Sequence, residues 1–236
     1  MATDAAGGQH LVITGANRGI GAELARQALA RGDRVTVTVR DPNAPAVVEL
    51  ASLGGAAFTT LTADVTEPET LAAAAEQTAH PIDVLICNAG QFRGRGGMDG
   101  GDLGPDAWEA TLMTNVAGVF FTIQAFLPHL RAAKAPRIAV VSSIMASSAR
   151  APGGSYIYRA SKAAATNLAR NLAQDLAGDG IAVGAYHPGW VRTDMGGSAA
   201  DIDTGTAAAG LLARFDALGP ASTGIFEDYR GEAIAF

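Results

Sequence analysis

The stretch Leu11-Val12-Ile13-Thr14-Gly15-Ala16-Asn17-Arg18-Gly19-Ile20-Gly21 decides the fold of this chain. Its apolar start predicts a buried strand, its glycines predict a tight turn, and the alanine-rich residues 22–30 predict a helix. A glycine turn between a strand and a helix lets the backbone approach a pyrophosphate, whose charge is met by free N–H groups and the positive end of the helix dipole. The spacing differs from the familiar Gly-x-Gly-x-x-Gly, so an ordinary glycine turn is the alternative to a dinucleotide site.

Strand and helix patterns alternate along the rest of the chain. We expect further strands at 34–39, 57–61, 82–87, 138–141, 181–186 and 224–226, and further helices at 45–53, 68–79, 106–133, 155–178 and 206–218. Repeated strand and helix units require a parallel sheet covered on both faces, with ligands bound beyond the carboxyl ends of the strands. The predicted fold is α/β, a single-domain Rossmann-type doubly wound parallel sheet of about seven strands, in which residues 1–236 form one domain and 1–9 a flexible lead-in.

The composition narrows the classes of protein. Hydrophobic residues make up 48% and charged residues 17%, and the net charge of −6 offers no basic field for nucleic acid. No apolar run approaches the about 18–20 residues of a membrane span, so we expect a cytoplasmic protein with a small-molecule partner. Cys87, the only cysteine, excludes an internal disulfide and a cysteine-based metal site, and its apolar neighbours predict a buried thiol. We therefore expect no metal site.

The end of the strand at 34–39 bears on the choice of cofactor. A carboxylate there suits a ribose 2′-hydroxyl, and an arginine suits a 2′-phosphate. Val39 stands where the carboxylate is expected and Arg40 follows it, so Arg40 and Arg18 would flank a 2′-phosphate. The sequence favours NADP(H) over NAD(H). Asp41 argues for the opposite choice, and a solvated strand end is the alternative role of Arg40.

Two further strand ends carry polar residues. Asp64 and Val65 follow the strand at 57–61, where an adenine is expected, and capping of the next helix is the competing role of Asp64. Asn88-Ala89-Gly90 follows the next strand along the chain. Its glycine allows the close approach of a cofactor, and a buried Asn amide can tie adjacent strands together.

Tyr158 and Lys162 lie four residues apart in the predicted helix at 155–178 and therefore on one face of it. A phenol with a pKa of about 10 is a poor acid at neutral pH. An ammonium about 4 Å away is worth on the order of 4 kcal/mol at an effective dielectric of about 20, which would lower that pKa by up to about three units. Lys134 is the only other lysine, which weakens the alternative of a packed tyrosine beside a solvated lysine. The pair predicts acid–base chemistry at Tyr158.

The motifs occur along the chain in the order Thr14-Gly15-x-x-x-Gly19-x-Gly21, Asn88-Ala89-Gly90, Asn115, Ser142-Ser143, Tyr158-x-x-x-Lys162 and Pro188-Gly189-x-x-x-Thr193. As an ordered set they resemble the short-chain dehydrogenase/reductase family over nearly the whole chain. The surroundings of the last two motifs are similar to the branch of the family that contains the C-signalling factor and the sniffer-like carbonyl reductases.

The resemblance implies a catalytic set of Asn115, Ser143, Tyr158 and Lys162. In this set Tyr158 protonates a carbonyl oxygen as hydride arrives from nicotinamide, and Ser143 hydrogen-bonds the same oxygen. Lys162 lowers the phenol pKa and binds the nicotinamide ribose, while Asn115 holds a water in a proton relay. Ser143 lies two residues farther from Tyr158 than is usual in the family. We interpret this as an enlarged loop at 145–154, with Ser147 as the alternative catalytic serine.

The cofactor-binding residues that the motifs and the resemblance indicate are Gly15, Asn17, Arg18, Gly19, Ile20, Gly21, Arg40, Asp64, Val65, Asn88, Ala89, Gly90, Tyr158, Lys162, Pro188, Gly189, Val191 and Thr193. Among them, Thr193 would fix the nicotinamide carboxamide. The resemblance also implies a homodimer or homotetramer, formed through the helices at 106–133 and 155–177. Dimer and tetramer remain open at this point.

A glycine-rich loop at 91–104 borders the expected site. Its Arg93 and Arg95 either meet an acidic substrate or keep the loop in solution. We expect the substrate pocket to be lined by Met145, Trp190 and Met195, which suits a modest hydrophobic ketone or aldehyde. The predicted function is an NADP(H)-dependent oxidoreductase that interconverts a carbonyl and an alcohol. The alternative is a nucleotide-binding signalling or sensing module with incidental catalysis, because fold alone does not fix function.

Overall fold

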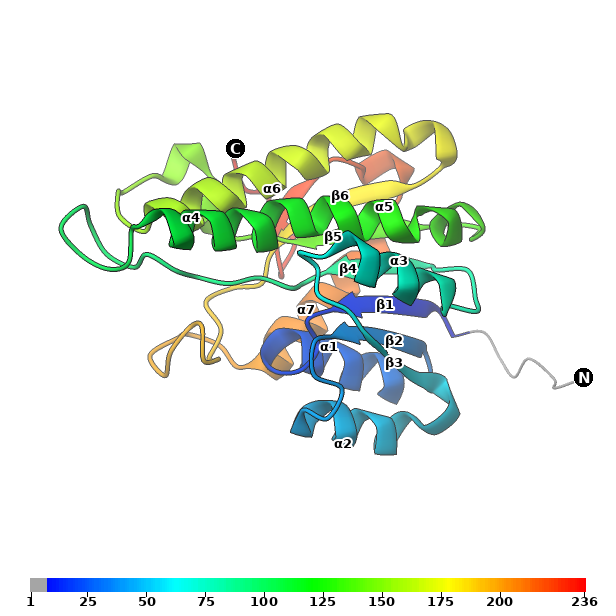
Figure 1. The fold of residues 1–236 in the computed structure, drawn as a ribbon. Helices are drawn as coiled ribbons and strands as arrows, with labels where there is room; N and C mark the ends of the chain where they lie inside the picture. Colours follow the sequence, from blue (N-terminus) through cyan, green and yellow to red (C-terminus); the bar gives the residue numbers. More distant parts are fainter. Residues whose placement is uncertain (1–7) are drawn as a thin grey trace, which may run out of the picture.

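Seven parallel strands form the centre of the structure, a computed structural model that describes residues 8–236 (Figure 1). Their bounds are β1 His10–Thr14, β2 Arg34–Val39, β3 Phe58–Thr62, β4 Val84–Cys87, β5 Arg137–Val141, β6 Ala182–His187 and β7 Phe226–Asp228. The strand order is β3-β2-β1-β4-β5-β6-β7, and every neighbouring pair is parallel. The predicted doubly wound sheet is confirmed.

Helices cover both faces of the sheet (Figure 1). One face is covered by α1 Gly19–Ala30, α2 Pro45–Gly54 and α7 Thr204–Ala217, and the other by α3 Pro68–Glu76, α4 Pro105–Leu112, α5 Gly118–Arg131 and α6 Tyr156–Asp175. Each helical layer packs a separate apolar cluster against the sheet. The central strands are apolar on both faces for this reason, and β1, β4 and β6 contain almost no exposed side chain.

The strand order reverses between β1 and β4. The connections that leave these two strands therefore part to opposite sides of the sheet, and a crevice opens beyond their carboxyl ends. The turn after β1, the segment after β4, the loop at 91–104 and the loop between β6 and α7 all meet at this end of the molecule (Figure 1).

The helical segment Pro105–Arg131 differs from its prediction in two respects. It contains a π-helical turn at Met113–Ala117, which joins α4 to α5 without a break. An 18-residue window of its 27 residues has a mean hydropathy of 1.5, so it is also long and apolar enough to cross a membrane by length and composition alone. The expectation that no segment of the chain reaches this measure is therefore wrong. In the fold, this segment packs against α3, α6 and β4.

The predicted lead-in at 1–9 falls largely on residues 1–7, which lie outside the described residues. Gln9 belongs to the ordered fold, because its backbone N–H donates to Asp33 at 3.0 Å and its side-chain amide donates to Asp216 at 3.1 Å. Arg137 at the start of β5 donates to the side-chain oxygen of Gln9.

Candidate active site

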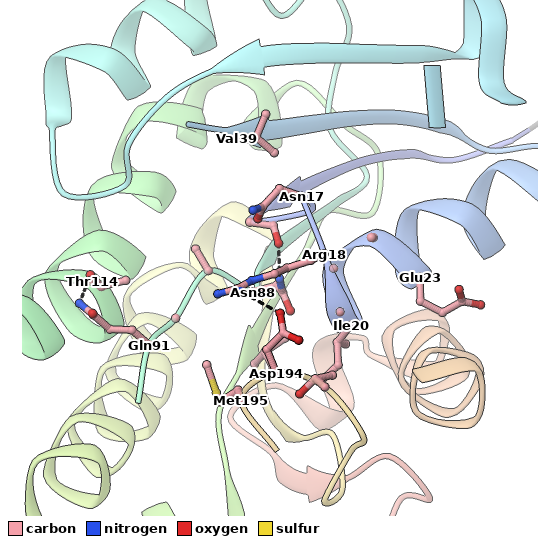
Figure 2. Close-up of a pocket in the computed structure, with 18 of the residues that line it drawn as sticks. Asn17, Arg18, Ile20, Glu23, Val39, Asn88, Gln91, Thr114, Asp194 and Met195 are labelled. Atoms are coloured by element: carbon pink, nitrogen blue, oxygen red, sulfur yellow. Dashed lines mark hydrogen bonds and ion pairs between the residues drawn. The ribbon is translucent and has the colours of Figure 1, made fainter. Parts of the chain in front are cut away.

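A cleft of about 830 Å³ opens at the carboxyl ends of β1, β2, β4 and β5 (Figure 2). It brings together sixteen of the eighteen residues predicted to bind a cofactor, and Gly189 and Val191 are the two that do not line it. Val191 is instead buried in a bridge to Ile202, and a side chain at Gly189 would meet the same Ile202. Both residues support the loop beneath the cleft.

The glycine turn forms the floor of this cleft. Gly15 and Gly19 have φ angles of +71° and +58°, in the left-handed region that favours glycine. A Cβ at Gly21 would lie 2.5 Å from the Asn88 side-chain nitrogen and 2.6 Å from the Gly15 carbonyl oxygen. The first N–H groups of α1 have no side-chain cap, since the residue before the helix, Arg18, has no side-chain acceptor. Bare backbone at a helix start, with no Cβ in the way, fits the pyrophosphate of a dinucleotide.

The Asn88 amide ties the sheet to this turn, as predicted. Its nitrogen donates to the carbonyl oxygens of Thr14 at 3.0 Å and Gly15 at 3.2 Å. The Thr14 hydroxyl in turn accepts from the backbone N–H groups of Asn88 and Ala89, both at 3.0 Å. These bonds fix the ends of β1 and β4 on either side of the crevice.

Near the end of β2, the carboxylates are hydrogen-bonded within the protein, whereas the arginine is nearly free. Arg40 is exposed, and its nearest carboxylate is Asp64 at 3.8 Å. Asp41, which spoke against NADP(H), accepts a hydrogen bond from the backbone N–H of Asn43 at 2.9 Å. Asp64 likewise accepts from the backbone and hydroxyl of Thr66, so it shapes a turn as well as lining the cleft. The guanidinium of Arg40 thus lies at the cleft with only a weak internal partner.

Arg18 has a partner that the sequence did not reveal. Its Nη1 lies 2.8 Å from Asp194 Oδ2, across the mouth of the cleft, and both side chains are exposed (Figure 2). An ion pair between two exposed side chains contributes little to stability, about 0–1 kcal/mol. Arg18 is consequently available to a ligand phosphate.

Tyr158 and Lys162 lie on one face of α6, and both line the cleft. Lys162 Nζ donates to the Val141 carbonyl oxygen at 2.8 Å and lies 5.8 Å from the centre of the Tyr158 ring. Burial raises the pKa of Tyr158 to about 12, and burial lowers the pKa of Lys162 to about 8. The expectation that the Lys162 ammonium depresses the phenol pKa is therefore wrong for this structure, because burial raises that pKa and the groups that lower it are Ser143 and Arg95.

Ser143, and not Ser147, faces the tyrosine. The Ser143 side chain favours the charged form of Tyr158, so it lowers the pKa of the phenol and opposes the larger effect of burial. Ser143 also accepts from the Met145 N–H at 3.1 Å, at the start of a short helical turn. The Ser147 hydroxyl is buried without a hydrogen-bond partner in the described chain. Two short helical turns, Ile144–Ala146 and Ser148–Arg150, lie within the loop at 145–154 and just before it.

Asn115 is fully buried in the π-helical turn and uses its amide entirely within the protein. Its nitrogen donates to the Gln91 carbonyl oxygen and to the Ser161 hydroxyl, both at 2.9 Å. Its oxygen accepts from the Gln91 N–H at 2.9 Å. The side chain therefore joins the segment after β4 to α6 beside Tyr158. A Cβ at Gly90 would lie 3.3 Å from the Asn115 oxygen and 3.5 Å from Lys162 Nζ, so only a glycine leaves this corner open.

Sequence reasoning missed several residues of the cleft and misplaced two of the three residues predicted to line the substrate pocket. Met195 lines it as predicted, whereas Met145 and Trp190 do not. Trp190 is half exposed and donates from its indole to the Gly196 carbonyl oxygen at 2.9 Å. The additional lining residues are Ala22, Glu23, Arg26, Thr38, Val39, Asp41, Ala46, Ala63, Gln91, Thr114, Val141, Ser142, Arg192, Asp194 and Thr204. Gln91 donates to Thr114 at 2.8 Å within this set (Figure 2).

The strand order, the glycine turn and the cleft define a dinucleotide-binding protein of the Rossmann class. The sequence matches the short chain dehydrogenase family over residues 9–203. The C-signal of Myxococcus xanthus is 38% identical over 158 residues, which cover 65% of this chain and 92% of that protein. The chain belongs to the short-chain dehydrogenase/reductase family of oxidoreductases, whose members use a nicotinamide cofactor.

Solved structures show the same branch of the family. The NADPH-bound carbonyl reductase from chicken fatty liver is 30% identical with a TM-score of 0.87, covering 97% of this chain and 99% of that chain. The carbonyl reductase Sniffer of D. melanogaster is 27% identical with a TM-score of 0.89, again covering 97% of this chain and 99% of that one.

Proposed function

We propose that this protein is an NADP(H)-dependent oxidoreductase that interconverts a carbonyl and an alcohol, with Tyr158 as the general acid and base. One observation carries the proposal: the buried Tyr158 phenol, whose pKa the Ser143 side chain lowers against the effect of burial, lines a cleft whose glycine turn fits a dinucleotide. Bound nicotinamide would supply or accept the hydride. The NADPH-bound carbonyl reductase among the similar structures supports this reaction class.

The residues of the chain have distinct tasks in this proposal. With a pKa of about 12, Tyr158 is protonated at neutral pH, which is the form that donates a proton to a carbonyl oxygen. The Ser143 hydroxyl holds that oxygen and the phenol together. Lys162, fixed by the Val141 carbonyl, and Asn115, fixed by Gln91 and Ser161, frame the open corner at Gly90. This corner is where we place a relay that returns a proton to Tyr158 from solvent.

The test of the reaction class is oxidation of NADPH by the purified protein in the presence of aldehydes and ketones. Loss of cofactor absorbance that requires both the protein and a carbonyl is the expected result. Absence of carbonyl-dependent loss across aliphatic, aromatic and acid-bearing carbonyls would contradict the proposal.

Replacing Arg40 with Leu is expected to weaken NADPH binding about 10- to 100-fold and to leave NADH binding nearly unchanged. The expected loss corresponds to one hydrogen-bonded charge pair with the 2′-phosphate. Fluorescence titration with each cofactor measures both affinities. Arg26→Leu is the matched control, because Arg26 lines the same cleft but is held by Glu49 at 2.6 Å and Glu23 at 3.2 Å. A wild-type preference for NADH, or equal losses for both cofactors, would overturn the choice of NADP(H).

We further propose self-association through the helical face formed by α4, α5 and α6. This face exposes Trp108, Phe120 and Tyr156, one aromatic side chain on each helix. Light scattering at micromolar concentration is expected to give a multiple of the 23.9 kDa chain mass, and Phe120→Asp is expected to shift that mass towards the monomer. The control is Val48→Asp, an exposed apolar site on α2 across the sheet. A monomeric wild-type protein would refute this proposal.

We also propose that the protein is cytoplasmic, as expected from its sequence.

A further inference from the structure

The loop at 91–104 forms a bridge over the catalytic end of the cleft. The Phe92 ring stacks on the Tyr158 ring with centroids 4.1 Å apart and planes 11° from parallel. The Arg95 guanidinium lies 4.1 Å from the Phe92 centroid and donates to the Met195 carbonyl oxygen. Since Tyr158 and Met195 both line the cleft, Phe92 and Arg95 close its end between α6 and the loop after β6.

The bridge is held in place by the glycines of the loop. The Ser155 N–H at the start of α6 donates to the Gly96 carbonyl oxygen at 2.7 Å. Gly94, with a φ of +66°, is wedged so that a Cβ would lie 2.9 Å from the Ile157 side chain. The position of Arg95 therefore follows from the backbone of the loop and its contacts with the first turn of α6.

Arg95 is also the charged side chain that influences the pKa of the Tyr158 phenol. Within residues 8–236, Arg95 forms no ion pair. The two contacts of its guanidinium, with the Phe92 ring and the Met195 carbonyl oxygen, are both with neutral groups. Its charge lowers the pKa of Tyr158 against the larger effect of burial, and no carboxylate contributes to that pKa. A negatively charged substrate thus meets the charge of Arg95 beside Tyr158, while Asp194, the acid next to Met195 in the cleft, is paired with Arg18 at 2.8 Å.

We propose that Arg95 is the recognition group for a carboxylate on the substrate, so that the protein prefers aldehydes or ketones that carry a carboxylate beyond the reacting carbonyl. This inference rests on the proposed carbonyl chemistry at Tyr158. The guanidinium exchanges the Met195 carbonyl oxygen for the substrate carboxylate, which is a stronger, charge-assisted acceptor. The Arg95 guanidinium and the Tyr158 ring centre each lie 4.1 Å from the Phe92 ring centre, so they are at most twice that distance apart. We therefore propose a substrate in which one aromatic ring, lying alongside Phe92, separates the carboxylate from the carbonyl.

Arg93 provides the matched comparison. It lies in the same loop, carries the same charge and donates to the Gln91 side-chain oxygen at 3.2 Å. It contributes nothing to the pKa of Tyr158. Removing either arginine changes the net charge of the protein equally, so any difference between the two variants reports position and not overall charge.

The experiment compares 4-carboxybenzaldehyde with its methyl ester as substrates in the presence of NADPH. The ratio of kcat/KM values, acid over ester, is expected to fall about 10- to 100-fold in Arg95→Met, as for the loss of a hydrogen bond between charged groups. The ratio is expected to change less than about threefold in Arg93→Met, and Arg95→Lys should restore it in part, since lysine keeps the charge without the planar fork. The inference would be overturned by equal acid-over-ester ratios in wild type and Arg95→Met, or by an equal fall of this ratio in both Met variants. Turnover of the methyl ester in the same assays would show that the proposed carbonyl chemistry still holds.

A binding measurement separates this inference from failure of the carbonyl chemistry. Calorimetry with 4-methylbenzoate and 4-methylbenzamide needs no turnover. We expect the benzoate to bind wild type and Arg93→Met at least about tenfold more tightly than it binds Arg95→Met, and the benzamide to show no such difference. If the benzoate binds all three proteins equally, Arg95 is not the carboxylate site, whatever the activity assays show.

Discussion

Carbonyl reduction should fall at least about a hundredfold when Tyr158 is replaced with Phe, because general acid catalysis by a positioned side chain contributes about 10²- to 10⁴-fold. The substitution removes one hydroxyl and keeps the ring that stacks on Phe92. NADPH affinity is therefore expected to change by less than about tenfold, since one neutral hydrogen bond contributes about 0.5–1.5 kcal/mol. Steady-state kinetics and a fluorescence titration on the same preparation measure the two quantities.

Ser143 and Ser147, two of the three buried serines in the β5–α6 loop, supply the controls for this prediction. Ser143→Ala removes the hydroxyl that faces Tyr158, so it should also lower kcat, whereas Ser147→Ala removes a buried hydroxyl with no partner in the described chain and should leave kcat unchanged. Turnover that survives in Tyr158→Phe would exclude Tyr158 as the proton donor. A larger loss in Ser147→Ala than in Ser143→Ala would show that the catalytic serine was misassigned.

Asn115→Ala should be the most destabilising substitution near the site. It leaves the part-buried N–H and carbonyl of Gln91 without their partner, and each unsatisfied buried group costs about 1–3 kcal/mol. It also removes one of the two bonds of the Ser161 hydroxyl, which still donates to the Tyr158 carbonyl oxygen at 2.8 Å. We expect a loss of about 3 kcal/mol in the free energy of unfolding, which for a chain of this size corresponds to roughly 6–12 °C in Tm. Turnover should fall as well, because the segment at 89–91 no longer has a fixed position beside Lys162.

Thermal unfolding followed by circular dichroism tests the stability change. Asn171→Ala is the control, since Asn171 is exposed on α6 and bonds only to Asn167 one turn away. It should shift the free energy of unfolding by less than about 0.5 kcal/mol. If Asn115→Ala unfolds at the wild-type temperature, the amide does not hold the segment after β4, and the account of its three hydrogen bonds fails.

The sequence was sufficient to predict the sheet and the location of the site. Near-continuous apolar strands, a glycine turn before a helix and polar residues at successive strand ends leave one arrangement, a parallel sheet with a ligand at its carboxyl edge. The Tyr158 and Lys162 pair followed from helical spacing, and the tie between Asn88 and β1 followed from the need to satisfy a buried amide.

Other features of the site depend on contacts between distant segments, which no local pattern encodes. Helical spacing predicted that Tyr158 and Lys162 share one face. It could not predict that the Lys162 ammonium donates to the Val141 carbonyl oxygen, or that burial raises the pKa of the Tyr158 phenol. The glycine-rich loop at 91–104 has no periodicity from which the direction of Phe92 or Arg95 follows. The Arg18 partner, Asp194, lies 176 residues away in the sequence.

The central claim is that hydride passes from the cofactor to a carbonyl carbon beside Tyr158. Incubating the protein with NADPH that carries deuterium at the transferable C4 position, together with 4-carboxybenzaldehyde, tests it directly by mass spectrometry and NMR of the product. The account predicts an alcohol with one deuterium on the former carbonyl carbon, and no such product from Tyr158→Phe over the same time. Tight NADPH binding with no deuterium transferred to any carbonyl would contradict the account and favour a nucleotide-sensing protein.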